Sequence, residues 1–158
     1  MRQVLAALAV SLAGAASAQT CLVEKLPAPN DTSQYDAMMR ALMLAHAPIE
    51  YRKSCGLRDD SDRGFFEAIR LGVGCSDSAA YAQFMGGVLE EGGSYLVAVE
   101  RTDLRSDEDF ERYCSIVERI DLESAVKDDG KVNAAALRAQ APLFHAIQEL
   151  IATRRWNN

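Results

Sequence analysis

Two histidines are the residues best suited to acid–base or metal chemistry, and neither has a partner at a useful spacing. His46 precedes Ala47 and Pro48, and His145 follows Phe144. A metal site needs three or four converging ligands, and neither histidine belongs to an HExxH or Glu-x-x-His motif. The chain also has no nucleophile elbow, P-loop or dinucleotide-binding glycine motif. We expect no metal, no cofactor and no catalytic residue, and keep an enzyme with a site built from scattered residues as an alternative.

The four cysteines, Cys21, Cys55, Cys75 and Cys114, are better suited to disulfides than to redox or metal chemistry. No two of them form a CxxC pair, and an even number in an exported chain favours two disulfides. Three pairings are possible. We prefer Cys21–Cys75 with Cys55–Cys114, because antiparallel helices before and after Cys55 would return Cys75 to the end of the bundle where the chain enters. Each bridge would stabilise the fold by ~2–4 kcal/mol.

The acidic loop over residues 58–64, RDDSDRG, superficially resembles a calcium-binding loop. With Gly64 at position six, Arg63 falls at position five and Arg70 at position twelve. A calcium loop needs an oxygen ligand and a bidentate glutamate at these two positions, so the match fails.

The same loop instead predicts a helix start, with Ser61 or Asp60 capping a helix over residues 62–73. Its carboxylates, on Asp59, Asp60 and Asp62, are also candidates for contact with a basic partner protein.

A second candidate partner surface consists of the methionines Met38, Met39, Met43 and Met85. Methionine-rich helical surfaces can bind varied partners, but methionine is also a common filler of protein cores. We favour the core interpretation and keep the partner surface as the alternative.

The N-terminal residues predict export. Arg2 precedes an apolar run over residues 4–12, and residues 16–18 form a small-residue cleavage site. The run is too short to cross a bilayer, which takes ~20 residues. We expect residues 1–18 to be a secretory signal peptide, cleaved between Ala18 and Gln19. The mature chain would then be periplasmic or secreted, with no stable membrane anchor.

The mature chain would have 140 residues, which suggests a single domain over residues 19–158, with an extended arm over residues 19–31. The net charge is −6, and it becomes −7 when Arg2 leaves with the signal peptide. This charge argues against binding nucleic acid or anionic membranes, which attract clusters of lysine and arginine.

Apolar periodicity predicts an all-α fold, a compact bundle of about five to six short helices stapled by two disulfides. The first helix covers residues 34–47 and stops at Pro48, and a further short helical turn ends at Gly56. A helix within residues 75–93, capped by Asp77 or Ser76, is the element around which we expect the bundle to be organised.

Three later features complete this predicted fold. Gly86 and Gly87 lie inside the helix of residues 75–93; we favour close approach of a neighbouring helix there, with a kink beside a groove as the alternative. Residues 95–99 are predicted as helix rather than strand, because no partner strand is evident. A helix follows Ser106, and the region 134–155 should be interrupted by Pro142.

These features favour a small exported protein-binding module, such as an inhibitor, an immunity factor or a chaperone-like adaptor. The alternatives are an envelope structural or small-ligand-binding module, which would use a cavity between helices, and an enzyme with a non-obvious site.

Overall fold

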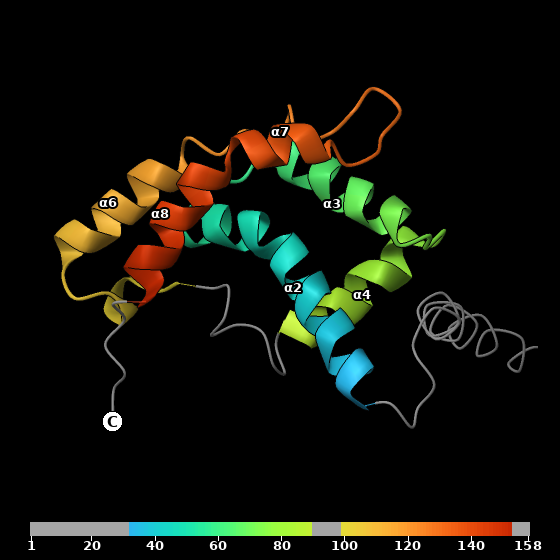
Figure 1. Ribbon diagram of the computed structural model, residues 1–158, viewed down its shortest axis with the longest axis horizontal. Helices are drawn as coiled ribbons and strands as arrows, with labels where there is room; N and C mark the ends of the chain where they lie inside the picture. Colours follow the sequence, from blue (N-terminus) through green and yellow to red (C-terminus); the bar gives the residue numbers. More distant parts are fainter. Residues whose placement is uncertain (1–31, 90–98, 153–158) are drawn as a thin grey trace, which may run out of the picture.

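The protein is all-α in the computed structural model, which describes residues 32–89 and 99–152. Within these ranges there is no β-strand, and the only extended pairing is an isolated bridge between Val126 and Val132. The six described α-helices and one short 3₁₀ helix (Figure 1) are α2 (Thr32–Ser54), α3 (Asp60–Gly72), α4 (Ser78–Val88), η2 (Arg101–Asp103), α6 (Asp107–Val117), α7 (Ala134–Ala139) and α8 (Ala141–Ala152).

Helix α2 does not stop at Pro48, so the prediction of a short first helix is wrong. It continues to Ser54 and is 23 residues long. A proline inside a helix costs ~3 kcal/mol because it removes one backbone hydrogen bond and crowds the preceding turn. Burial outweighs this cost, since Ala47, Ile49 and Tyr51 flank Pro48 in the core. Figure 1 shows that α2 changes direction along its length.

The two halves of α2 contribute to different apolar clusters. The C-terminal half packs in the main core with α3, α6, the segment after α6 and α8. In the N-terminal half, Leu42 packs with Cys75, Tyr81 and Met85 in a smaller cluster at α4. The long helix therefore links α4 to the rest of the bundle.

Most helix starts follow the predicted capping chemistry. The side chains of Asp77, Ser106 and Asn133 accept hydrogen bonds at the N-termini of α4, α6 and α7. Helix α3 differs, because its cap is Asp59 rather than Ser61 or Asp60.

The last helical region is interrupted near Pro142 as predicted. It forms two helices, α7 and α8, with Gln140 as the C-cap of α7.

The glycines inside α4 do not provide close helix packing. A Cβ atom added at Gly86 or Gly87 would meet no atom within 4 Å, so the favoured interpretation of this pair is wrong. A positive φ of 76° does require glycine at Gly74, after α3, and at Gly130, in the turn before Val132.

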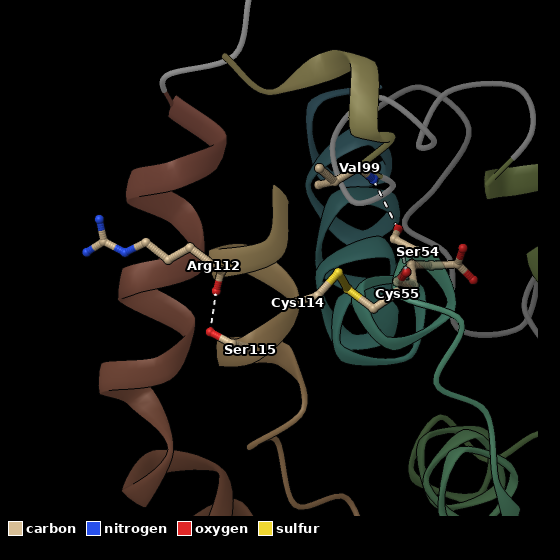
Figure 2. The surroundings of a disulfide bond; sticks show 7 residues. Ser54, Cys55, Val99, Arg112, Cys114 and Ser115 are labelled. Atoms are coloured by element: carbon tan, nitrogen blue, oxygen red, sulfur yellow. Dashed lines mark hydrogen bonds between the residues drawn. A yellow bond between two sulfur atoms is a disulfide. The ribbon is translucent and has the colours of Figure 1, made fainter. Parts of the chain in front are cut away.

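One disulfide is present among the described residues, where the sequence predicts two. Cys55, directly after α2, is bonded to Cys114 in α6 with an S–S distance of 2.11 Å (Figure 2). This is one of the two preferred pairs. No described cysteine is a free thiol. Cys21 lies outside the described ranges, so the pair Cys21–Cys75 stays a prediction.

Several other predictions also fall outside the described residues. They concern the signal peptide at residues 1–18, the arm at 19–31, the end of the helix predicted within residues 75–93, and residues 95–98. Across the described part of the chain, no helix is both long enough and apolar enough to span a bilayer.

Candidate binding cleft

The methionines predicted as an alternative partner surface do not form an exposed patch. Met43 is 9% exposed, and Met85 is 1% exposed in the smaller cluster. Met38 and Met39 are half-buried on α2. Met43 and Met85 are therefore core residues in this fold, and neither is available to a partner.

The three aspartates of the acidic loop lie in different environments. The side chain of Asp60 is 92% exposed and pairs with Arg63, one turn further along α3, at 2.9 Å. The Asp59 side chain is 60% exposed. Asp62 is 7% exposed and faces the protein interior, so it does not belong to an exposed acidic surface.

Arg52, in the last turn of α2, holds this loop in place. Its Nε donates to Asp62 Oδ1 at 3.0 Å, and its Nη2 donates to Asp59 Oδ2 at 2.8 Å. Its Nη1 also reaches the backbone carbonyl of Ile120, after α6, at 3.5 Å. Arg52 is 7% exposed, and its buried guanidinium therefore connects the start of α3 to the segment that follows α6.

Asp59 and Asp62 together cap the N-terminus of α3, because each carboxylate accepts a hydrogen bond from a backbone N–H there. Asp59 Oδ1 accepts from the Ser61 backbone N–H at 2.9 Å, and Asp62 Oδ2 accepts from the Asp59 backbone N–H at 2.8 Å. This capping box satisfies backbone donors that a helix start otherwise leaves unpaired. The three-residue spacing of Asp59 and Asp62 is a local signal of this capping box, and Arg52 reinforces it by binding both carboxylates.

An open cleft of about 770 Å³ lies between the start of α3 and the segment over residues 120–128. One side is formed by α3 and the loop before it, and Arg52 lies between the two sides. The lining residues are Arg52, Asp59, Asp60, Ser61, Gly64, Ile120, Asp121, Leu122, Glu123, Val126, Lys127 and Asp128.

The second side of the cleft brings in carboxylates that sequence reasoning missed. Asp121, Glu123 and Asp128 join Asp59 and Asp60, so five acidic side chains and two basic ones line the cleft. The composition of residues 121–129 is an acidic signal that could have suggested them. Nothing in the sequence, however, shows that this segment faces residues 59–60.

The cleft is negatively charged at neutral pH. Hydrogen bonds from the Ser61 side chain and backbone lower the pKa of Asp59, and the charge of Arg52 adds to this effect. Hydrogen bonds from Ser124 lower the pKa of Asp121 in the same way. Glu123 and Asp128 form no side-chain hydrogen bond or ion pair with any part of the chain that the structure describes.

A smaller hollow of about 310 Å³ lies on the other side of Asp59. Its lining is Ile49, Arg58, Asp59, Asp62, Arg63 and Phe66. Asp59 lines both hollows, so they are neighbours across one side chain.

The two histidines lie outside both hollows. His46 is buried, its Nε2 lies 2.9 Å from the Tyr81 hydroxyl, and its burial lowers its pKa to about 4. His145 is exposed and lies 3.3 Å from Glu149. Among residues 32–89 and 99–152, no group of three or more histidine, cysteine or acidic side chains could hold a metal ion.

The chain matches no protein-family model, no curated protein and no solved structure. Its fold and cleft define it as a helical domain with an open acidic cleft.

Proposed function

We propose that this protein is an exported protein-binding module whose cleft accepts a cationic segment of a partner protein. The observation that carries the proposal is the gathering of five carboxylates from two segments far apart in sequence around one open cleft. An inhibitor, an immunity factor and a chaperone-like adaptor are all proteins of this kind. Export is proposed from the signal-like residues 1–18.

Two of the carboxylates in the cleft are placed to form ion pairs with a partner. Glu123 and Asp128 have no cation of their own among the described residues, while Asp62 is already neutralised by Arg52. Charged rims mainly raise the association rate and select partners of opposite sign. A lysine- or arginine-bearing segment is the complementary partner.

A peptide-binding measurement tests this proposal. A fluorescein-labelled peptide of glycine and lysine should bind the mature protein, and a matched peptide of glycine and glutamate should not. Binding of the lysine peptide should weaken as salt is raised, because added salt screens exposed charges.

The double variant Glu123→Gln/Asp128→Asn should weaken binding of the lysine peptide by about tenfold, which corresponds to ~1.4 kcal/mol. The matched control is Glu108→Gln/Glu111→Gln, which removes the same charge from exposed positions on α6 outside the cleft. Equal losses in the two variants would mean that only net charge matters, and would refute the cleft as the site.

Two glycine-to-leucine variants test the same site by steric obstruction, without changing any charge. Gly64 lines the cleft, and Gly72 lies on the same helix outside it. A Cβ atom added at either glycine meets nothing within 4 Å. Gly64→Leu should therefore obstruct the lysine peptide while Gly72→Leu leaves its binding unchanged, with both proteins folded.

The export part of the proposal has its own test. N-terminal sequencing of the protein recovered from a secreting bacterial host should give a mature chain that begins at Gln19. A chain that keeps residues 1–18 would refute this part alone.

A small-ligand-binding module is the second candidate, because the cleft volume of about 770 Å³ lies within the ~300–1,000 Å³ range typical of small-molecule sites. Thermal-shift screening with small cationic molecules separates the two candidates. A small cation that stabilises the protein while no lysine peptide binds would favour the second one.

A further inference from the structure

We infer that the partner segment carries an apolar residue beside its cationic residue, and that this apolar side chain occupies the smaller hollow next to the cleft. The inference rests on the proposed function and specifies the partner that it would recognise. It follows from the position, chemistry and rigidity of the hollow lined by Ile49 and Phe66.

The position of the smaller hollow suits a single segment that reaches both sites. Asp59 lines the acidic cleft and the smaller hollow alike. Arg52 and Ser61 hold its carboxylate from two directions, at 2.8 Å and 2.9 Å. The Asp59 side chain is thus held in place between the two hollows. A peptide that lies across it would place one of its side chains in the cleft and a neighbouring one in the smaller hollow.

The chemistry of the two hollows differs. In the smaller one, Asp62 is neutralised by Arg52, and Asp59 is shared with the same guanidinium. Arg58 and Arg63 also line this hollow, so its two carboxylates are matched by two guanidinium groups. A second cation gains no net attraction from these balanced charges, whereas an apolar side chain can contact Ile49 and Phe66.

The two apolar residues of the smaller hollow, Ile49 and Phe66, are already held in place in the protein alone. The Phe66 ring packs against His46, with ring centroids 5.1 Å apart, and against Tyr81, with centroids 5.3 Å apart. Ile49 is fixed in α2 and is 8% exposed. A preformed hollow binds with less loss of conformational entropy than one that must be ordered on binding.

The test compares short peptides of glycine and lysine in which one glycine is replaced. Leucine is placed at successive distances from the lysines, and matched peptides carry alanine or an additional lysine at the same position. At the best distance, leucine should tighten the dissociation constant by about tenfold over alanine. The additional lysine should gain less than leucine there, because the two acidic and two basic side chains of the hollow give it no net attraction.

Methyl NMR then places the leucine. The Ile49 methyl resonances should shift with the leucine peptide and remain in place with the alanine peptide. Ile147, which is buried in the core at α8, is the control methyl. This comparison changes the peptide and not the protein, so no variant has to fold.

The outcomes separate the two proposals. If lysine peptides bind through Glu123 and Asp128 but leucine brings neither tighter binding nor a shift at Ile49, the inference is wrong and the proposed function stands. If no lysine peptide binds at all, both are wrong.

Discussion

Replacing Arg52 with leucine should reduce the free energy of unfolding by about 3–5 kcal/mol, because it leaves the Asp62 carboxylate buried without its cation. The ion pair is 3.0 Å long, and each side chain is 9% exposed. A domain of this size has ~5–15 kcal/mol of total stability, so the loss is a large fraction of it. The exposed Asp59 carboxylate should contribute far less, since water solvates it when Arg52 is absent.

Urea unfolding followed by circular dichroism measures this effect in a double-mutant cycle of Arg52→Leu, Asp62→Asn and the double variant. Asparagine keeps an oxygen for the Asp59 backbone N–H but removes the buried charge. The double variant should therefore be more stable than Arg52→Leu alone, with a coupling of ~1–3 kcal/mol. Additive effects, or a loss below ~1 kcal/mol for Arg52→Leu, would refute the buried pair as a main support of this end of the bundle.

Three further predictions concern other parts of the fold. His46 has a pKa of about 4 in the folded protein against 6.5 for the unperturbed group, so the unfolded state binds more protons between these values. Stability should fall by roughly 3 kcal/mol as the pH drops from 6.5 to 4, and His46→Gln should flatten this part of the urea-midpoint profile. Gly64→Ala should stabilise α3 by ~1 kcal/mol, whereas Gly130→Ala should destabilise its turn, as thermal melts would show. Removing the Cys55–Cys114 disulfide, whose cysteines are 59 residues apart, in a Cys55→Ser/Cys114→Ser variant should cost ~4 kcal/mol, measured as a lower urea midpoint.

Local chemistry accounts for the parts of the fold that the sequence predicts well. Ser106 and Asn133 are capping residues directly before periodic apolar segments, and both cap helices as expected. Pro142 interrupts the last helical region for an equally local reason. These predictions need only a few neighbouring residues, which is why they hold without knowledge of the rest of the chain.

The errors occur where distant contacts decide the outcome. Pro48 is tolerated within α2 because the residues on both sides of it are buried against α3, α6 and α8. Asp59 caps α3 through its reciprocal hydrogen bonds with the helix start, and Arg52, from the end of α2, holds both Asp59 and Asp62 in that arrangement. Neither the burial nor the ion pair has a signature within a few residues of the position concerned.

The cleft is the strongest case of this dependence on distant contacts. The sequence identifies the acidic loop, but the cleft also needs the segment after α6 to lie opposite it. Besides core packing, that arrangement is supported by the Arg52 contact with the Ile120 carbonyl and by the disulfide between Cys55 and Cys114. Both begin near the C-terminal end of α2 and reach α6 or the segment directly after it.

The end of α2 also forms hydrogen bonds through Ser54. The Ser54 hydroxyl donates to the Glu50 carbonyl at 2.9 Å. It also accepts from the Val99 backbone N–H at 3.2 Å (Figure 2). The end of α2 therefore takes part both in the buried contacts of the bundle and in the lining of the cleft. Loss of binding in an Arg52 variant would mix these two effects, whereas Glu123 and Asp128, which support nothing else in the described fold, report on binding alone.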